Sequence, residues 1–413
     1  MNLFLLVSFF LMAQSLFAFN QEIEIINADE VWTAEIDDIP SGALDSSGSN
    51  FNLLDEVVIC HADEVWNYGF NELDSGLTDS SNIGFELPNE AIVCHADEVF
   101  STRLDNIEID SGPNIEIRTP ILFVPGLLGT KIKDSENNYI WIDLDRIINP
   151  LRPDSYSDSF LDLLVFGYNL KPTNDLFLEY VIKQETYLGT VFNYTKGLID
   201  EFASKGYVEN KDFFTFPYDW RYGVSGVYPI PENSSQRPLT NSDLLAARIN
   251  ELALNSPTGK IDIIAHSMGG LVVKKYVMDN TDPKINKLVF VGVPNLGSPQ
   301  SAKTLLIGDD FKVPGLNQDE TKKISRNMPA AYDLLPSAPY FAKRGGYLAQ
   351  IEAFIQPAIY FKTLDYNQTN AYLNQRLNST ALANARNLRS ADNFDNYDIR
   401  SKISKTYNIV GCK

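Results

Sequence analysis

The chain has few of the residue types on which small cross-linked domains and metal modules depend. It contains 3 cysteines and 3 histidines in 413 residues, too few for a disulfide scaffold or a cysteine-rich zinc module. Basic residues are also outnumbered, with 34 Lys and Arg against 54 Asp and Glu. A nucleic-acid-binding surface would be basic, so the net charge of −20 argues against nucleic acid as a partner.

Apolar residues, by contrast, are plentiful. Hydrophobic residues make up 44% of the chain and aromatic residues 12%, enough for a large core. The charge is uneven: residues 19–118 carry 23 acidic and 2 basic groups, net −21, whereas residues 119–413 carry 31 acidic and 32 basic groups, net +1. The two regions are therefore predicted to differ in character, with an acidic region preceding the main domain.

The first segment, residues 1–18, is an uncharged apolar run that ends at Ala18. Its length fits a signal peptide, which predicts a secreted or extracytoplasmic protein. The alternative is an uncleaved membrane anchor and a membrane-associated protein. The run is short for that purpose, because a spanning helix needs about 20 apolar residues.

A repeat with a spacing of 34 residues occupies the acidic region. The motif reads NADEVW at residue 27, HADEVW at residue 61 and HADEVF at residue 95. Short apolar runs precede each copy (EIEII, EVVIC and EAIVC), with Gly, Ser and Asp between them. These runs predict strands and turns, and hence a small β-type array or a tethering stalk. The sequence indicates no partner for it.

Two copies of the repeat contain a Cys-His pair, Cys60-His61 and Cys94-His95. A metal site is one interpretation. The loose ligand spacing makes it the weaker one, and we assign no metal ligand. In an exported chain a disulfide between Cys60 and Cys94 is favoured, which leaves Cys412 unpaired.

From Thr119 onward, apolar runs alternate with helical patterns. The run at residues 242–254 has helical spacing, and Ser242 is placed to cap its start. Buried strands that alternate with amphipathic helices predict a mostly parallel sheet covered on both faces, with ligand sites at the carboxyl ends of strands. The predicted strands are 121–124, 213–216, 261–264 and 287–293.

The strand at 261–264 runs into Ala265-His266-Ser267-Met268-Gly269-Gly270, and a helical pattern follows. This order matches the G-x-S-x-G nucleophile elbow, in which small residues let strand and helix pass closely. Ser267 is the predicted nucleophile, and the amide of Met268 the predicted oxyanion donor. Ala265, Gly269 and Gly270 supply the small positions. His266 is expected to be structural, because a neighbouring elbow residue points away from the serine's reacting face.

The first strand of the domain ends in Pro125-Gly126-Leu127-Leu128-Gly129-Thr130. A glycine-rich loop at this end of a strand can bring a second amide to the same oxyanion, and Leu127 is the predicted donor. A plain turn is the alternative.

Five segments in this order resemble the lecithin:cholesterol acyltransferase and lysosomal phospholipase A family of α/β-hydrolases. They are PILFVPGLLGT (120–130), FPYDWR (216–221), HSMGG (266–270), GVPNLGSP (292–299) and NMPAAYDLLPS (327–337). The resemblance covers 119–413 and implies an α/β-hydrolase fold, with a lid at 131–195 and a cap at 300–400.

The family implies a ping-pong mechanism without a cofactor. Ser267 would take an acyl group from a lipid ester at a membrane or lipoprotein-like surface, and would pass it to water or an alcohol. Asp219 and Arg221 of FPYDWR are expected to pair structurally. The stretch 340–361 is either part of the cap or a core helix and strand.

The chain departs from the family at its end. A hydrolase triad runs Ser, acid, His, but no histidine follows His266, and the sequence stops at Lys413 after the predicted strand 406–411. We therefore assign neither the triad acid nor the histidine. The chain as given is expected to be nearly inactive and to expose an unpaired strand edge. A C-terminal truncation is the hypothesis, tested by reading the coding DNA past codon 413.

Two other functions stay open. One is a catalytically dead protein that binds lipid or a surface, and the other is a carboxylesterase or triacylglycerol lipase on the same fold. Asn-x-Ser/Thr sites occur at Asn193, Asn233, Asn367 and Asn378.

Overall fold

The computed structural model describes residues 23–25, 57–61, 91–94, 118–148, 158–187, 190–230, 235–311, 313, 316–355 and 358–412. The predicted signal peptide and most of the acidic region, including His95, lie outside the described residues.

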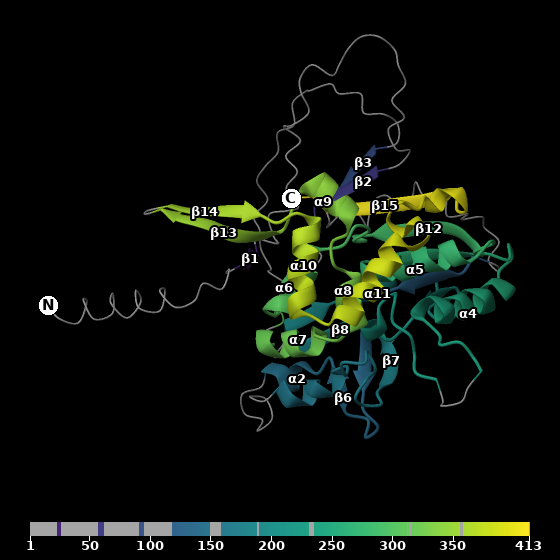
Figure 1. Cartoon of the computed structure of the whole chain (residues 1–413). Coiled ribbons are helices and arrows are strands. Elements are labelled where there is room, and N and C mark those ends of the chain that lie inside the picture. The colour runs from purple at the N-terminus through teal and green to yellow at the C-terminus, as the bar shows by residue number, and fades with distance from the viewer. Residues whose placement is uncertain are drawn as a thin grey trace, which may run out of the picture.

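The centre of the described chain is a parallel sheet of seven strands (Figure 1). Its order is β10-β4-β11-β12-β15-β2-β3, and every neighbouring pair is parallel. The bounds are β2 (Val57–His61), β3 (Ala91–Cys94), β4 (Ile121–Val124), β10 (Phe213–Thr215), β11 (Ile261–His266), β12 (Ile285–Val291) and β15 (Lys405–Cys412). The strands predicted from the apolar runs all occur, and the predicted α/β fold is confirmed.

Helices lie around this sheet (Figure 1). The α-helices are α2 (Leu144–Ile148), α3 (Lys196–Ser204), α4 (Asn241–Leu254), α5 (Met268–Asp279), α6 (Pro299–Leu306), α7 (Gln318–Ser325), α8 (Pro329–Asp333), α9 (Ala338–Arg344), α10 (Tyr366–Arg376) and α11 (Ser379–Ser390). Short 3₁₀ turns are η3 (Asp158–Leu164), η4 (Trp220–Tyr222), η5 (Ala391–Asn396) and η6 (Ile399–Ser401).

Strand β4 shows how the sheet is covered on both faces. Ile121 and Phe123 belong to one cluster, with Phe202 of α3. Leu122 and Val124 belong to the larger cluster, which includes the buried faces of α4 and α5. Successive strand residues point to opposite faces, so a strand buried on both faces must be apolar throughout. This explains the uninterrupted run ILFV.

The repeat strands β2 and β3 extend the central sheet, which differs from the predicted array or stalk in front of the domain. β2 pairs with β15, and β3 pairs with β2. β15 therefore has a partner on each side, and the expectation of an unpaired edge at this strand is wrong. The pairing of β2 with β15 could not be predicted, because strand pairing between distant segments leaves no local sequence pattern. The division of the chain at residue 118 stays a prediction.

The β2–β3 register repeats the sequence period. Val57 lies opposite Ala91, and Cys60 lies opposite Cys94. The two residues of each pair are 34 positions apart in the sequence, which is the period of the repeat. Equivalent positions of two repeats are thus neighbours across the strands. The predicted disulfide between Cys60 and Cys94 stays a prediction that this register favours.

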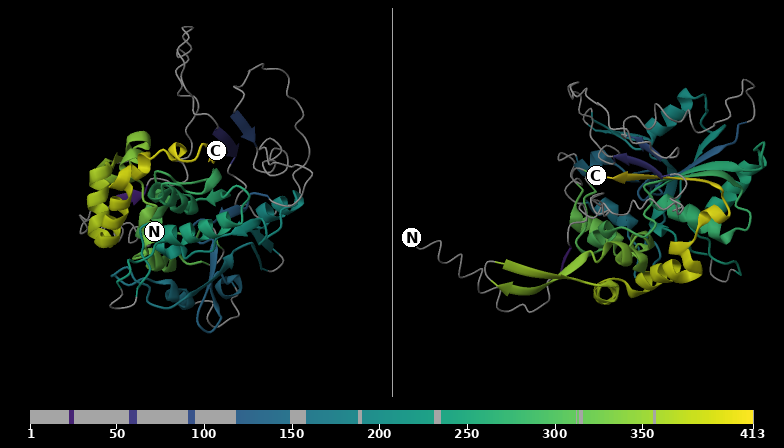
Figure 2. Two further views of the ribbon diagram at one scale, coloured as in Figure 1. Left: turned by 90° about the vertical axis from the view of Figure 1, so that its right-hand side faces the viewer. Right: turned by 90° about the horizontal axis from the view of Figure 1, so that it is seen from above.

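The segments predicted as lid and cap contain further small sheets. β5 (Thr130–Lys133) lies between β6 (Tyr139–Trp141) and β7 (Phe177–Val181), and β8 (Gln184–Tyr187) pairs with β9 (Thr190–Asn193). A third sheet joins β1 (Ile23–Ile25), β13 (Leu348–Ile355) and β14 (Ala358–Thr363). Figure 2 shows the β13–β14 hairpin projecting from the body of the domain.

The start of the stretch 340–361 belongs to the core, as one of the two alternatives predicts, and its role as part of a cap stays a prediction. The core contains its residues Tyr340, Tyr347 and Leu348. The chain then continues into the β13–β14 hairpin. Phe361, on β14, is 46% exposed.

The start of α4 differs from the prediction, because Thr240 and not Ser242 is the cap. The Thr240 hydroxyl accepts from the Asp243 amide at 3.3 Å, and the Asp243 carboxylate accepts from the Thr240 amide at 2.9 Å. This capping box satisfies two donors at once. The helix begins earlier than its apolar spacing indicates because Asn241 is buried and donates to the carbonyls of Asp219 and Gly223.

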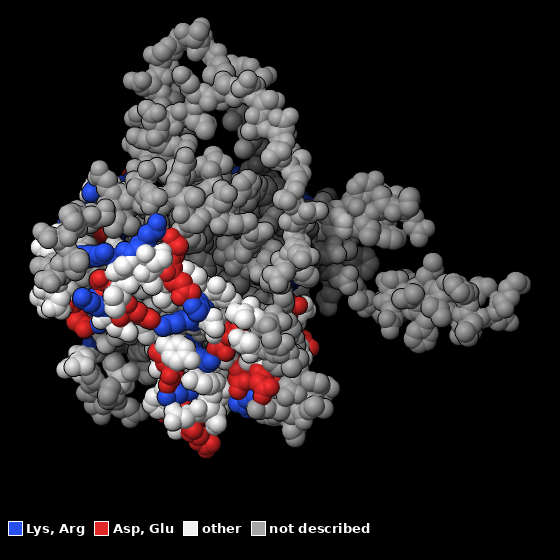
Figure 3. Space-filling view, turned by 180° about the vertical axis from the view of Figure 1, so that it is seen from behind, with Lys and Arg blue, Asp and Glu red and all other residues white. Residues whose placement is uncertain are grey.

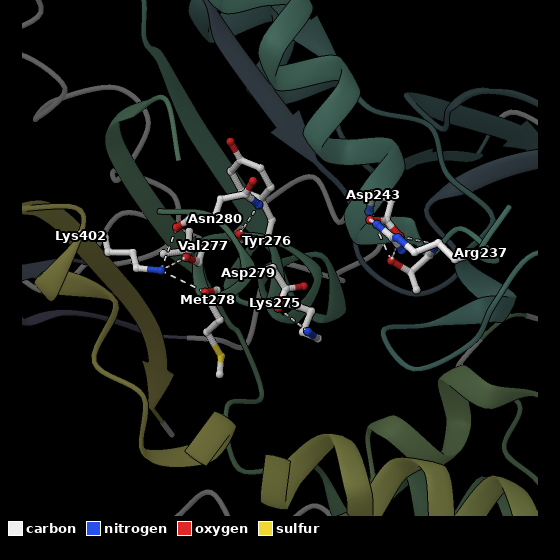
Figure 4. Close-up of polar contacts among 10 residues, drawn as sticks. Arg237, Asp243, Lys275, Tyr276, Val277, Met278, Asp279, Asn280 and Lys402 are labelled. Carbon is white, nitrogen blue, oxygen red and sulfur yellow. Dashed lines mark hydrogen bonds and ion pairs between the residues drawn. The ribbon is translucent and has the colours of Figure 1, made fainter. Parts of the chain in front are cut away.

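Charged side chains fix both ends of the α4–α5 pair (Figure 4). Arg237 donates twice to the Asp243 carboxylate, at 3.0 and 2.6 Å, and chiefly this contact lowers the pKa of Asp243 to about 2. At the C-terminus of α5, the Lys402 ammonium donates to the carbonyls of Val277, Met278 and Asn280 at 2.8, 3.0 and 2.8 Å. A cation there satisfies carbonyls that the helix leaves without partners.

The described surface carries both signs of charge. On the face seen from behind, basic and acidic side chains are interspersed (Figure 3). Asn193 and Asn367 are exposed, whereas Asn378 is 2% exposed. The Asn378 side-chain amide donates to Tyr168 and Asn327, so this sequon is not an accessible glycosylation site. Asn233 lies outside the described residues.

Of the helices that the structure describes, none combines the length and apolar character that crossing a bilayer requires.

The capping box predicts a difference between two neighbouring substitutions. Thr240→Ala removes the cap and should lower the free energy of unfolding by about 1 kcal/mol, measured by urea denaturation. Ser242→Ala, inside the first turn, should cost less. A larger loss for Ser242→Ala would show that Ser242 is the cap after all.

Candidate active site

Ser267 lies at the bend between β11 and α5. Its backbone has φ 50° and ψ −128°, a left-handed conformation that is uncommon for a residue with a side chain. The Ser267 amide donates to the Val291 carbonyl at 2.9 Å, and the Ser267 carbonyl accepts from the Gly270 amide at 3.0 Å. The side chain is partly exposed. Strand, strained turn and helix thus occur in the order that the motif predicts.

The small residues around Ser267 are explained by close backbone contacts. A Cβ on Gly269 would lie 2.3 Å from the Pro125 carbonyl oxygen, and one on Gly270 would lie 2.2 Å from a methyl of Val293. Ala265 is fully buried. The first turn of α5 therefore packs directly on the ends of β4 and β12, which larger side chains would prevent.

The loop 125–130 lies against Ser267. The Gly129 amide donates to the Gly126 carbonyl at 3.2 Å, and Leu128 has φ 65°, so the loop is a tight turn. A Cβ on Gly126 would lie 2.7 Å from the Ser267 Cβ and 3.2 Å from its Oγ. Gly126 is thus a site residue that was not predicted. The signal available in the sequence was a Pro-Gly pair directly after a buried strand.

The amides of Leu127 and Met268 stay the predicted oxyanion donors. The carbonyl and the N–H of a trans peptide point in opposite directions, so a Gly126 carbonyl directed into the turn directs the Leu127 N–H out of it. Met268 is the first residue of α5, where amides have no partner within the helix. Amides at a helix N-terminus and on a turn can together stabilise a negatively charged oxygen.

His266 lies beside the same loop. Its Nδ1 would be 3.2 Å from a Cβ on Gly126. Desolvation lowers the pKa of His266 to about 4, so the imidazole is neutral at physiological pH. His266 is thus an uncharged side chain beside Gly126, and its structural role stays a prediction.

The PYDWR segment donates hydrogen bonds to the loop 125–130. Arg221 and Asp219 form a buried bidentate ion pair, with N–O distances of 2.9 and 2.7 Å, which confirms their predicted pairing. The fully buried Tyr218 donates to the Pro125 carbonyl at 2.9 Å, and the Trp220 indole to the Thr130 carbonyl at 3.1 Å. Tyr218 and Trp220 were not predicted to contact the site, because only the pairing of β10 with β4 brings them there.

We assign the triad acid and histidine to none of the described residues. The described residues place a hydroxyl at a strained bend, beside the tight turn 125–130. A hydroxyl held in this way can attack a carbonyl carbon, and nearby backbone amides can stabilise the anion that forms.

Comparisons with known proteins bear on this arrangement. A family model described as lecithin:cholesterol acyltransferase matches residues 179–410, which include Ser267. The chain is similar to lysosomal phospholipase A and acyltransferase of Bos taurus, with 22% identity over 254 residues, 53% of this chain and 58% of that protein. It is also similar to lecithin-cholesterol acyltransferase-like 4 of Arabidopsis thaliana, with 28% identity over 158 residues, 36% of this chain and 27% of that protein.

The chain therefore spans little more than half of the first relative's length and about a quarter of the second's. Among solved structures, the Tle4–Tli4 complex is similar at 16% identity and a TM-score of 0.35, over 70% of this chain and 74% of that one.

The contact of Gly269 with the Pro125 carbonyl predicts a severe effect of one methyl group. Gly269→Ala should lower the free energy of unfolding by about 3 kcal/mol or more, because neither backbone can move aside. The matched control is Gly197→Ala, on the exposed side of α3, where the nearest atom is the flexible end of Asn193. It should leave stability equal or higher. Similar losses in both variants would contradict the close packing.

The lowered pKa of His266 predicts that stability depends on pH. The pKa is about 4 in the folded protein and about 6.5 in the unfolded chain, so only the unfolded chain takes up this proton between those values. Stability that is fully present above pH 6.5 is therefore lost as the pH falls to 4, by about 3 kcal/mol. Urea denaturation at pH 7, 6, 5 and 4 should show this loss in the wild type and not in His266→Gln. If the free energy of unfolding changed with pH equally in both proteins, the lowered pKa of His266 would be refuted.

Proposed function

Because the chain belongs to the lecithin:cholesterol acyltransferase family, we propose that it is a lipid acyl-ester hydrolase or O-acyltransferase that works through a serine acyl-enzyme. The observation that carries the proposal is the strained backbone of Ser267, between the carboxyl end of β11 and the first turn of α5. Strain of this kind persists where surrounding structure enforces it, and it is common at reacting residues. Here the bend holds the hydroxyl at the edge of the sheet, beside the loop 125–130.

The reaction follows from this placement. The Ser267 Oγ adds to the acyl carbonyl of a lipid ester, and the amides of Leu127 and Met268 donate to the oxyanion that forms. Collapse of the adduct breaks the ester bond, leaves the acyl group on Ser267 and releases the alcohol. Water or a second alcohol then takes the acyl group by the reverse steps. In the first half, a general base, which we assign to none of the described residues, takes the Ser267 proton and gives it to the leaving alcohol. In the second half, the same base takes the proton of the water or alcohol and returns it to the Ser267 Oγ.

Exposed apolar side chains support a lipid surface as the place of reaction. Tyr168, Phe177 and Tyr180, all within the predicted lid, are 69%, 50% and 43% exposed. Aromatic side chains of this kind partition into membrane interfaces. A secreted or extracytoplasmic location follows from the predicted signal peptide.

The product of the natural gene, made with its native ends, tests the proposal with a fluorophosphonate probe. We expect labelling of the wild type and of Ser204→Ala, a serine exposed on α3, and no labelling of Ser267→Ala. Hydrolysis of a phospholipid should fall about 10⁴-fold or more in Ser267→Ala, because the nucleophile is lost. A folded wild type that takes no label would favour the catalytically dead lipid-binding protein.

Substrate comparison separates the remaining alternatives. We expect faster release of fatty acid from phospholipid vesicles than from a triacylglycerol emulsion, and formation of a new ester when a long-chain alcohol is added. Preference for triacylglycerol without transfer to the alcohol would indicate a lipase or carboxylesterase instead.

A further inference from the structure

The loop that faces Ser267 is held by side chains from outside it. Its carbonyls at Pro125, Leu128 and Thr130 accept from the Tyr218 hydroxyl at 2.9 Å, the Trp141 indole at 2.8 Å and the Trp220 indole at 3.1 Å. Trp141 is 5% exposed, and the other two donors are 1% exposed or less. Buried donors of this kind are costly to remove, because a carbonyl without a partner then stays desolvated.

Tyr218 itself cannot move freely. Its amide donates to the Thr130 hydroxyl at 3.1 Å, and its ring stacks on Phe216 with centroids 5.8 Å apart. Burial raises the pKa of Tyr218, so the hydroxyl keeps its proton and remains a donor at physiological pH. The phenol is therefore a fixed donor beneath the loop.

The Pro125 carbonyl lies where the loop touches the elbow. A Cβ on Gly269 would approach this oxygen to 2.3 Å, and on another side it accepts from Tyr218. A peptide unit is planar, so holding this oxygen restrains the Pro125–Gly126 plane. The next peptide carries the Leu127 amide, and its carbonyl is held by Gly129. The Tyr218 hydroxyl thus restrains the peptide that directly precedes the one carrying the Leu127 amide.

We infer that Tyr218 is a positioning residue, whose hydroxyl orients the Pro125–Gly126 peptide and thereby places the Leu127 amide relative to the Ser267 Oγ. This rests on the proposed function, in which that amide stabilises the oxyanion. Because the donor must lie about 2.7–3.1 Å from the developing charge, a shift of about 1 Å in the loop lowers the rate while ground-state binding is kept.

The chain offers a matched control in Tyr276. Its hydroxyl donates to a proline carbonyl, that of Pro283, at 2.8 Å, and the residue is 1% exposed. It lies in the second half of α5, next to the C-terminal contacts in Figure 4. Tyr218→Phe and Tyr276→Phe therefore remove the same kind of buried hydrogen bond, one under the loop and one away from it.

Two measurements on the natural gene product compare these variants. Hydrogen exchange of peptides that cover 120–130 should rise at least about tenfold in Tyr218→Phe, and should not change in Tyr276→Phe. For phospholipid hydrolysis, kcat should fall about 10- to 100-fold in Tyr218→Phe, with KM within about threefold of the wild type. Tyr276→Phe should keep both constants. Both variants should lower the melting temperature.

The outcomes separate the inference from the proposed function. Equal effects of the two variants on loop exchange or on kcat overturn the positioning role, because loss of stability alone would explain them. A rise in KM with unchanged kcat also overturns it. If the wild type hydrolyses no lipid ester, the proposed function fails, and unchanged loop exchange in Tyr218→Phe would overturn the structural hold as well. Should Tyr218→Phe not fold, Thr130→Val removes the acceptor of the Tyr218 amide and should raise loop exchange in the same way.

Discussion

The contact between the end of β4 and the first turn of α5 is the constraint on which the site depends. The Pro125 carbonyl oxygen lies so close to the Cα of Gly269 that no side chain fits there. This approach brings the loop 125–130 against Ser267 and the first turn of α5 against the end of β4. The strained φ of 50° at Ser267 is maintained because strand and helix are both anchored in the core.

The support for this contact comes from segments far apart in sequence. β10 pairs with β4, and the segment that follows β10 carries Tyr218 and the buried Asp219–Arg221 pair under the loop. Trp141, from the small sheet within the predicted lid, donates to the Leu128 carbonyl. The predicted lid segment is therefore in contact with the loop beside Ser267.

Sequence alone predicted much of this. Local sequence patterns were enough to predict the strands, the bend at Ser267 and the α/β order. The structure has these elements at the predicted positions. The prediction that Ser242 caps α4 was wrong, because Asn241 is anchored by a tertiary contact with residues 219 and 223. Gly126 and Tyr218 were missed because their importance comes from what lies against them. The pairing of β2 with β15 likewise joins segments about 350 residues apart, and no local pattern reports it.

We propose that the amides of Leu127 and Met268 form one oxyanion site beside the Ser267 hydroxyl. A crystal structure of the natural gene product with a phosphonate bound to Ser267 tests this arrangement. We expect a phosphonyl oxygen about 2.7–3.1 Å from both amide nitrogens, with the loop 125–130 in place. A phosphonyl oxygen directed to solvent, or contacting neither amide, would contradict it.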